Sequence, residues 1–304
     1  MNREIIKKRL MDELGQKIIE ENASMADHTS FKTGGNAALL LTPQTIEDLK
    51  KGLQILTEEN CPHMVLGNGS NILVRDGGYE GVILKIGDAF DFVKQEEDCL
   101  ICGASTLLSV VAKAALKASL TGLEFASGIP GSMGGAVFMN AGAYDGELKQ
   151  VLKEARLISK DGSREFSMTA AELVMGYRHT RLHETGDVVI EAVLQLEKGD
   201  KEAIRSRMAE LAARRNEKQP VTFPSAGSFF KRPEGYFAGK LIQDAGLKGL
   251  SVGGAQVSEL HSGFIINTGG ATATDILQLM EIVRATVLDR FGVKLEPEVR
   301  IIGE

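Results

Sequence analysis

Residues 128–144 read Gly-Ile-Pro-Gly-Ser-Met-Gly-Gly-Ala-Val-Phe-Met-Asn-Ala-Gly-Ala-Tyr, and this stretch does most to decide the fold. Four glycines fall within its first eight residues, and an apolar segment follows them. A short helix that begins near Ser132 would point free N–H groups at a phosphate. A close contact between a helix and a sheet would also require small residues, but we favour phosphate binding.

A second glycine-rich loop, Gly67-Asn68-Gly69-Ser70-Asn71, joins two expected strands at residues 64–66 and 72–74. Glycines and small polar residues let backbone N–H groups converge on an anion. A tight turn explains this loop about as well. It is not a Rossmann fingerprint, because the third glycine is missing and a strand follows it instead of a helix.

Hydrophobic periodicity predicts a mixture of helices and strands along the rest of the chain. The first helix carries an apolar residue at every fourth position from residue 6 to residue 18. We expect Gly122 and Gly292 to stop two of the later helices. Those later helices are expected at residues 45–58, 107–119, 170–174, 201–218, 238–245 and 275–291, and further strands at 82–86, 151–158, 188–196 and 293–302.

Length and composition limit the class of protein. A chain of 304 residues is long enough for two or three domains. Its net charge of −6 argues against a general nucleic-acid binder. No segment reaches the roughly 18 apolar residues that span a bilayer, and the charged N-terminus lacks the apolar core of a signal peptide.

The cysteines and histidines predict no metal or redox centre. Three cysteines in a chain without an export signal indicate a reducing compartment, and we predict the cytoplasm. Cys99 and Cys102 match C-x-x-C, but residues three apart in a strand point to opposite faces, so we expect structural thiols. His179 and His183 lack the carboxylate or cysteine pattern that would complete a metal site, and His261 is expected to be a hydrogen-bonded structural residue.

Three short motifs in the second half carry side chains that could perform chemistry. Arg178 follows Gly176-Tyr177 and could bind a carboxylate or phosphate, although a lone arginine is more often a surface charge. Ser228 precedes an aromatic pair, and a structural hydroxyl at the start of a strand is the simpler interpretation. Glu298 follows Pro297, which restricts its strand to an edge or a strand start, and it could either work in a cleft or pair with a cation.

Six motifs in one order resemble the UDP-N-acetylenolpyruvoylglucosamine reductase family. The resemblance runs from Thr29-Ser30-Phe31-Lys32-Thr33-Gly34-Gly35 to the C-terminus, which is nearly the whole chain. The motifs are Gly-Asn-Gly-Ser-Asn at 67–71, Gly-Ile-Pro-Gly-Ser-Met-Gly-Gly at 128–135, Asn-Ala-Gly-Ala-Tyr at 140–144, Tyr-Arg at 177–178, Gly-Ser-Phe-Phe-Lys at 227–231 and Glu-Pro-Glu-Val-Arg at 296–300.

The resemblance implies an α+β fold. It combines a two-part FAD-binding region of the vanillyl-alcohol-oxidase-like type with a C-terminal α+β substrate-binding domain. We expect the first FAD-binding subdomain at residues 1–86, the second at 87–199 and the substrate-binding domain at 200–304, with Glu298 on a final strand at 293–302. The link from Arg178 to the strand at 188–196 is short, so the chain resembles the subclass that lacks a substrate-covering loop insertion.

The resemblance also assigns site residues. The catalytic positions are Arg178, Ser228 and Glu298. Non-covalent FAD would be held by Gly67, Asn68, Gly69, Ser70, Asn71, Gly128, Ile129, Gly131, Ser132, Gly134, Asn140, Ala141 and Gly142. The substrate would be anchored by Tyr177, Arg215, Lys218, Lys231 and Arg232.

The implied activity is the NADPH-dependent reduction of UDP-N-acetylenolpyruvoylglucosamine to UDP-N-acetylmuramate by way of FAD, in peptidoglycan precursor synthesis and hence in cell shape and division. Arg178 would hold the substrate carboxylate, Ser228 would protonate the neighbouring carbon, and Glu298 would act as a protonated acid or an orienting group. The implied partners are small molecules, with no nucleic acid or membrane insertion, and a monomer is favoured. The alternatives are an FAD oxidase of the same flavin-fold superfamily acting on an alcohol or sugar, and a catalytically inactive nucleotide-binding module.

Overall fold

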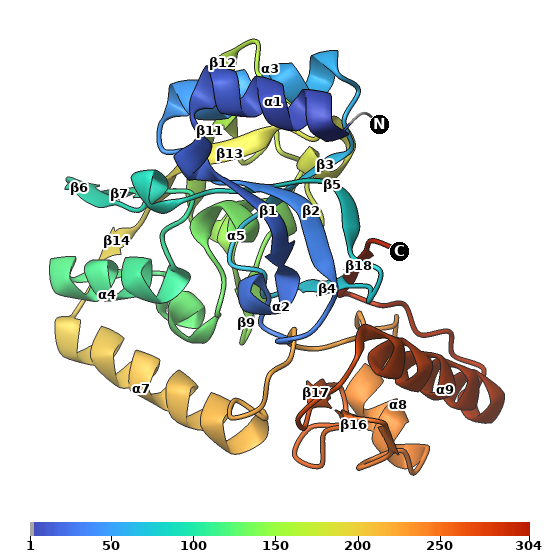
Figure 1. Cartoon of the computed structure of the whole chain (residues 1–304). Coiled ribbons are helices and arrows are strands. Elements are labelled where there is room, and N and C mark those ends of the chain that lie inside the picture. Colours follow the sequence, from blue (N-terminus) through green and yellow to red (C-terminus); the bar gives the residue numbers. More distant parts are fainter. Residues whose placement is uncertain (1–2) are drawn as a thin grey trace. The chain divides into compact units, whose positions relative to one another are not determined.

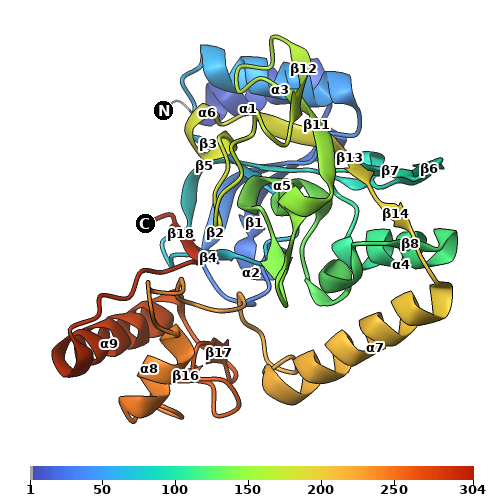
Figure 2. The ribbon, with the colours of Figure 1, turned by 180° about the vertical axis from the view of Figure 1, so that it is seen from behind.

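The computed structural model describes residues 3–304, which form two compact units, each assembled from three separate segments (Figures 1 and 2). The first unit comprises the chain up to Glu21 together with Leu39–Asn68 and Gly81–Arg214. The second comprises Asn22–Ala38, Gly69–Glu80 and Arg215–Glu304. Segments far apart in the sequence therefore share one core within each unit.

The first unit contains an antiparallel sheet of five strands in the order β12-β11-β13-β7-β6. The strands are β6 (Val93–Glu96), β7 (Cys99–Gly103), β11 (Leu152–Ile158), β12 (Glu165–Thr169) and β13 (Val188–Gln195). Helix α5 (Met133–Met139) packs against β13, and helix α4 (Leu108–Ala118) contacts β6 and β7. Apolar side chains of these elements are fully buried between them, and this core fixes the position of the glycine-rich stretch that leads into α5.

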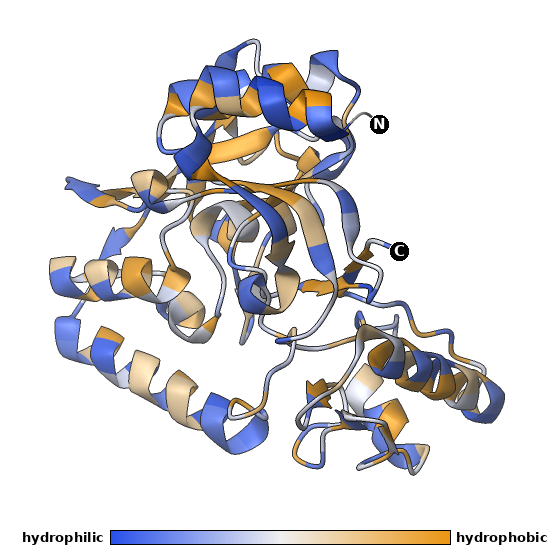
Figure 3. Cartoon of the chain, in the orientation of Figure 1, coloured by the Kyte–Doolittle hydropathy of each residue, from blue (hydrophilic) through white to orange (hydrophobic). Residues whose placement is uncertain are grey.

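A four-stranded sheet has the order β1-β2-β5-β3. Its strands are β1 (Ile19–Ser24), β2 (Asn36–Leu41), β3 (His63–Leu66) and β5 (Tyr79–Lys85), and β3 runs parallel to β5. Helix α3 (Ile46–Glu58) begins at Thr45, whose hydroxyl accepts a 3.0 Å hydrogen bond from the Asp48 N–H. Helix α1 (Arg3–Leu14) packs against α3. Figure 3 shows that both helices carry mixed polar and apolar positions, as expected for helices that cover a core.

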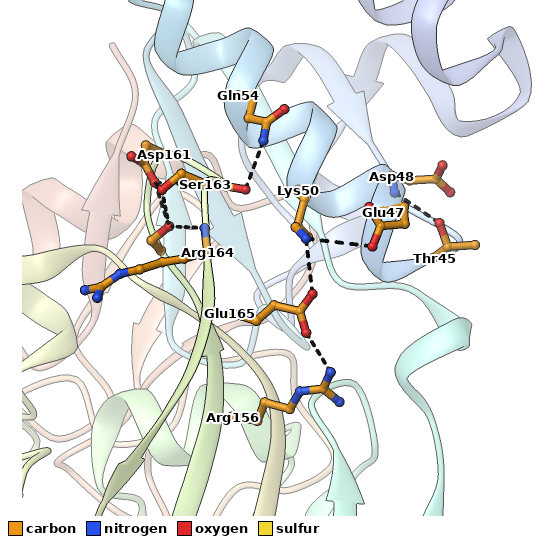
Figure 4. Close-up of polar contacts among 12 residues, drawn as sticks. Thr45, Glu47, Asp48, Lys50, Gln54, Arg156, Asp161, Ser163, Arg164 and Glu165 are labelled. Atoms are coloured by element: carbon orange, nitrogen blue, oxygen red, sulfur yellow. Dashed lines mark hydrogen bonds and ion pairs between the residues drawn. The ribbon is translucent and has the colours of Figure 1, made fainter.

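Ion pairs connect α3 to the hairpin of β11 and β12 (Figure 4). The Glu165 carboxylate accepts hydrogen bonds from Lys50 at 3.3 Å and from Arg156 at 2.6 Å. In the turn of the hairpin, Asp161 accepts a hydrogen bond of 2.6 Å from the Ser159 hydroxyl. Hydrogen bonds from Ser159 and from Ser163 lower the pKa of Asp161 to about 2, so this turn is closed by a carboxylate that stays ionised.

The second unit places helices against short strands. Strands β15 (Ser251–Val252), β16 (Ala255–Val257) and β17 (Ile265–Asn267) form an antiparallel sheet, and β4 (Ile72–Val74) pairs in parallel with β18 (Arg300–Ile302). Helix α8 (Ala238–Asp244) packs against α9 (Ala273–Phe291). Gly292 ends α9 in the left-handed conformation with φ 66°, as the sequence predicts.

Shorter elements complete the two units. They are α2 (Met25–His28), α6 (Leu182–Thr185), β8 (Leu120–Thr121), β9 (Gly142–Ala143), β10 (Gly146–Glu147), β14 (Glu197–Lys198) and the 3₁₀ helices Gln16–Ile18, Asp88–Phe90, Glu124–Gly128 and Leu148–Gln150. The long polar helix α7 spans Lys201–Lys218. Within residues 3–304, no helix combines the length and apolar character needed to cross a membrane.

Most expected elements are present, and four expectations need correction. Helix α1 ends at Leu14, so the last apolar position of the expected first helix, Ile18, lies in a 3₁₀ helix. Residues 170–174 form turns instead of a helix, because Val174 adopts φ 48°. Helix α4 is stopped by Ser119, which is left-handed at φ 57°, and not by Gly122. The expected strand at 293–302 is shorter, since only Arg300–Ile302 is a strand, and β12 was not expected at all.

The two cysteines of the C-x-x-C motif are free and differ in exposure. Cys102 is fully buried on β7, whereas Cys99 on the same strand is partly exposed and lies 3.1 Å from the Gln195 side-chain oxygen. Burial raises the pKa of Cys102 to about 12, so this thiol stays protonated and unreactive.

Candidate active site

A cradle formed by Gly67 and Ser132 lies where two glycine-rich loops meet in the first unit. A Cβ atom on Gly67 would lie 2.5 Å from the Ser132 Oγ and 3.8 Å from the Gly135 N atom. Ser132 occupies the N-cap position of α5 and is only 2% exposed, yet its hydroxyl makes no capping bond and has no other hydrogen-bond partner among the described residues. A buried hydroxyl that faces a position without a side chain suits an oxygen-rich ligand such as a phosphate.

A side-chain contact joins the two glycine-rich loops. The Asn68 amide donates a 2.7 Å hydrogen bond to the carbonyl of Pro130. The alternative explanation of the glycines, a tight helix–sheet contact, holds at Gly134, where a Cβ would lie 3.1 Å from the Ala104 Cβ. Close packing therefore accounts for Gly134, whereas the space beside Ser132 is left open by Gly67 of the other loop. Of the other expected residues here, Gly128 ends a 3₁₀ helix, Ile129 follows it, and Gly131 accepts a hydrogen bond from Leu108 N–H.

The rest of the first loop lies in the second unit. Gly69 adopts φ 65°, and a Cβ there would clash with the carbonyl oxygen of His28. The Asn71 amide donates a 3.2 Å hydrogen bond to the carbonyl of Glu298, and the Asn71 carbonyl accepts 3.0 Å from the Arg300 N–H. Asn71, expected at the cofactor, therefore also holds the segment that carries Glu298.

Ser228 and Glu298 lie on neighbouring backbone segments of the second unit. The Glu298 N–H donates 2.8 Å to the carbonyl of Phe229, and the Lys231 N–H donates 2.8 Å to the carbonyl of Glu296. Gly227, at φ 78°, precedes Ser228 and turns the chain there. Ser228 is exposed and Glu298 is partly buried. The structure therefore places two of the three expected catalytic residues on neighbouring backbone segments.

Arg178, the third expected catalytic residue, belongs to the first unit. It adopts φ 52° in a tight turn from Gly176 to His179. Its guanidinium donates 3.1 Å to the carbonyl of Gly142 and lies 5.1 Å from the ring centre of the exposed Tyr177. A left-handed arginine is uncommon, and such strain is frequently found at functional sites.

The expected substrate anchors and pocket residues are divided between the units. Arg215 and Lys218 lie in the last turn of α7, and Arg232 stacks over Phe237 with 4.0 Å to the ring centre. Lys231 lies 3.6 Å from the Glu296 carboxylate. The first unit holds Gly67, Asn68, Gly128, Ile129, Gly131, Ser132, Gly134, Asn140, Ala141, Gly142, Tyr177 and Arg178, and the second holds Gly69, Ser70, Asn71, Arg215, Lys218, Ser228, Lys231, Arg232 and Glu298.

Ser30 is a residue of this region that the motifs did not single out. Its hydroxyl donates 2.6 Å to the carbonyl of Ser225 and lies 3.4 Å from the carbonyl of Gly69. It therefore links the glycine-rich loop to the segment that leads into Ser228. The only sequence signal was the serine in Thr29–Gly35, which marked the start of the family resemblance.

The histidines serve packing. His183 stacks on Phe138 with ring centres 4.0 Å apart, and His179 lies 3.1 Å from the Glu184 carboxylate. The Nδ1 atom of His261 accepts a hydrogen bond from the Gly263 N–H at 3.0 Å, and burial lowers the pKa of His261. His261 is therefore a hydrogen-bonded structural residue, as expected. Across residues 3–304, no three His, Cys, Asp or Glu side chains converge as metal ligands would.

Comparison with known proteins gives two family matches and several close relatives. Residues 37–165 match the FAD binding domain family, and residues 219–302 match the family of the UDP-N-acetylenolpyruvoylglucosamine reductase C-terminal domain. The chain is 51% identical over 299 residues to UDP-N-acetylenolpyruvoylglucosamine reductase of Clostridium novyi, covering 98% of this chain and 97% of that relative. It is 52% identical over 286 residues to the protein of that description from Clostridium botulinum, covering 94% and 93%. The crystal structure of UDP-N-acetylenolpyruvylglucosamine reductase from Thermus caldophilus matches with a TM-score of 0.82 at 36% identity, covering 94% of this chain and 99% of that one.

Proposed function

The chain belongs to the UDP-N-acetylenolpyruvoylglucosamine reductase family and is an FAD-dependent oxidoreductase, and on that premise we propose that Arg178, Ser228 and Glu298 perform the reduction of the enolpyruvyl ether to UDP-N-acetylmuramate. The hydride comes from NADPH. The oxidase alternative and the inactive nucleotide-binding module are not favoured, because the relatives match over nearly the whole chain and are named for the reductase.

The residues of the glycine-rich loops fit the pyrophosphate of FAD. Gly67 leaves room beside Ser132, whose buried hydroxyl is available as a donor to an oxyanion. In this proposal the other expected cofactor residues of these loops line the same site, while Gly134 serves the close packing of α5 against Ala104. When bound, FAD supplies a carrier that accepts a hydride from NADPH and passes it to the substrate.

Arg178 binds the carboxylate of the enolpyruvyl group in this proposal. Hydride addition at the methylene carbon places a pair of electrons on the neighbouring carbon, conjugated with that carboxylate. A fixed guanidinium stabilises this charge better than mobile water, and such donors typically contribute about 3–4 kcal/mol each. The carbonyl of Gly142 and the ring of Tyr177 keep the guanidinium in place before substrate arrives.

Ser228 then donates its proton to the carbanionic carbon, which completes the D-lactyl ether, and the hydroxyl recovers a proton from water. Glu298 serves as a protonated acid or as an orienting group, because a bare carboxylate would repel the developing charge. One backbone pairing carries this assignment: the hydrogen bond of 2.8 Å from the Glu298 N–H to the Phe229 carbonyl sets Ser228 and Glu298 on adjacent segments.

The diphosphate and sugar of the substrate are anchored by cations and aromatic rings. We assign this role to Tyr177, Arg215, Lys218, Lys231 and Arg232, and we assign residues 1–86 and 87–199 to FAD and residues 200–304 to the substrate. The net charge of −6 makes local cations the natural means of holding a dianionic diphosphate. The product enters peptidoglycan synthesis, so we place the enzyme in the cytoplasm, as a monomer, with consequences for cell shape and division.

An anaerobic visible spectrum tests the function. We expect the purified protein to show a flavin spectrum that bleaches with NADPH and returns on addition of UDP-N-acetylenolpyruvoylglucosamine. A flavin that NADPH does not reduce would support the oxidase alternative. A protein that cannot take up FAD would contradict the assignment as a flavoenzyme.

A further inference from the structure

The side chain of Asn140 lies inside the first unit, fully buried, at the end of α5. Its amide nitrogen donates 2.8 Å to the Glu147 carboxylate and 2.9 Å to the carbonyl of Gly176, and its oxygen accepts 3.0 Å from the Lys149 N–H. Both N–H groups of the amide are therefore used within the protein. The Asn140 side chain cannot at the same time bind a cofactor through its nitrogen.

Gly176 begins the turn that carries Arg178. Within that turn, the Gly176 N–H donates 2.9 Å to the His179 carbonyl, but the hydrogen bond from the His179 N–H to the Gly176 carbonyl is long, at 3.4 Å. The hydrogen bond from the Asn140 amide to the same carbonyl is shorter, at 2.9 Å, and comes from the C-terminal end of α5. Because Arg178 holds φ 52°, a conformation costly for a residue with a side chain, a donor from outside the turn that holds the Gly176 carbonyl helps to keep this conformation.

Asn140 also fixes the second support of Arg178. Glu147 lies opposite Gly142 in the hairpin of β9 and β10, and Gly142 offers the carbonyl that accepts from the Arg178 guanidinium. Through its bond to Glu147, Asn140 restrains this hairpin as well. One buried amide therefore holds both the backbone of Arg178 and the carbonyl that aims its side chain.

We propose that Asn140 is a positioning residue, which acts on the reduction of the enolpyruvyl ether by holding Arg178 in place. This inference rests on the proposed role of Arg178. Only an amide satisfies the three partners, since Glu147 and the Gly176 carbonyl both need donors while the Lys149 N–H needs an acceptor. The family resemblance placed Asn140 in the cofactor pocket, whereas these contacts direct its side chain to the catalytic arginine.

The test is the variant Asn140→Asp in the FAD-loaded enzyme, followed anaerobically by stopped-flow absorbance. An oxygen replaces the donor nitrogen with little change in volume, so the Gly176 carbonyl loses this donor. We expect reduction of the flavin by NADPH to stay within about twofold of wild type and its reoxidation by UDP-N-acetylenolpyruvoylglucosamine to slow by about 10²-fold, as for a misplacement of about 1 Å.

A second variant separates an effect on the position of Arg178 from an effect on the stability of the protein. In the double variant Asn140→Asp with Glu147→Gln, the new glutamine amide donates to the carboxylate introduced at position 140, but the carbonyl of Gly176 still lacks its donor. We expect the thermal stability to recover and reoxidation to remain slow. Recovery of both together would reduce Asn140 to a structural role and overturn the proposal. Asn60→Asp is the matched control, because Asn60 also adopts a left-handed conformation, at φ 49°, but is exposed, and it should leave both rates unchanged.

The decisive comparison measures the effect of Asn140→Asp on reoxidation with and without the Arg178→Lys substitution. If Asn140 acts through Arg178, Asn140→Asp should slow reoxidation no further when Arg178→Lys is already present. Effects that multiply in the double variant would overturn the proposal. A wild-type enzyme that this substrate does not reoxidise, or an Arg178→Lys variant as fast as wild type, would instead remove the proposed function itself, and the inference would fall with it.

Discussion

The hydroxyl of Ser132 lies 2.5 Å from the point where a Cβ atom on Gly67 would be. Both residues adjoin regular elements, since Ser132 directly precedes α5 and Gly67 directly follows β3. The distance is too short for a real Cβ contact, so the glycine keeps the space in front of a buried hydroxyl open. In the function we propose, this relationship links a backbone position in one loop to cofactor binding by the other.

Gly67→Ala is therefore expected to weaken FAD binding. The added methyl group fills the cradle and forces the Ser132 hydroxyl aside, so we expect the Kd for FAD to rise by about 10-fold or more, equivalent to the loss of about one to two neutral hydrogen bonds. Titration of the apoprotein with FAD, followed by flavin fluorescence, measures this change. Gly176→Ala is the control, because a Cβ at Gly176 meets nothing within 4 Å. Equal FAD affinity in Gly67→Ala and wild type would place the pyrophosphate elsewhere.

Ser228→Ala should separate the two half-reactions. Removal of the hydroxyl leaves the glycine-rich loops untouched, so FAD content and the rate of flavin reduction by NADPH should match wild type. Reoxidation by UDP-N-acetylenolpyruvoylglucosamine should slow by roughly 10²–10⁴-fold, the usual contribution of a positioned acid. Ser251→Ala removes an exposed serine hydroxyl of the same unit and should have no effect. Rapid turnover of Ser228→Ala would exclude this residue as the proton donor.

Local patterns in the sequence predict most elements, because the signals that start and stop them are themselves local. Gly292 ends α9 as expected, α5 begins directly after Ser132, and α3 fills nearly all of the expected range 45–58. The turn at 170–174 was mistaken for a helix, because nothing in its composition reveals that Val174 is left-handed.

Contacts between distant segments explain what the sequence could not predict. The hydrogen bond from Asn71 to the Glu298 carbonyl joins residues that are 227 positions apart in the sequence. A local hydrophobic pattern carries no information about such a contact. Family resemblance identified Asn71 and Asn140 as important but gave both to the cofactor. The structure shows that each side chain also holds a segment with an expected catalytic residue, a role that depends on tertiary packing alone.

The Glu165 carboxylate, between Lys50 and Arg156, should stabilise the first unit measurably (Figure 4). Glu165 is only 25% exposed, so its ion pairs are less screened than those at the surface. Glu165→Gln should lower the free energy of unfolding by about 1 kcal/mol, near the upper end for such pairs. Urea unfolding measures the change. The control Glu202→Gln, at an exposed pair with Arg205, should have no measurable effect.

The effect of Glu165→Gln should depend on pH. The hydrogen bond from Arg156 lowers the pKa of Glu165, although burial opposes it. A depressed carboxylate pKa adds stability above the pKa of the unfolded chain, and this contribution is lost as the pH falls through the folded value. The two proteins should therefore differ at neutral pH and converge in acid. A difference that persists at low pH would mean that packing, and not charge, explains the loss.

Asp76 caps α9 from outside the helix, and Asp76→Asn should destabilise the second unit. The Asp76 carboxylate accepts 2.8 Å hydrogen bonds from the N–H groups of Ala273 and Thr274 and a 2.6 Å hydrogen bond from the Thr274 hydroxyl. An asparagine keeps one acceptor oxygen but loses the charge at the positive end of the helix. We expect a loss of about 1 kcal/mol in the free energy of unfolding, measured by urea denaturation, with the exposed Asp88→Asn as control.

The pH dependence of the stability shows whether Asp76 stabilises α9 through its negative charge or only through the shape of its side chain. Burial raises the pKa of Asp76, but the hydrogen bonds from Thr274 and Ala273 outweigh it, and the net shift is downward. The stabilisation is thus complete above the unfolded pKa of about 3.9 and disappears as the pH falls through the lower folded value. Wild type and Asp76→Asn should be equally stable once Asp76 is protonated. Because Asp76 lies on the loop after β4, which pairs with β18 close to Glu298, a loosened cap should also raise hydrogen exchange in β18, and unchanged exchange there would confine the effect to α9.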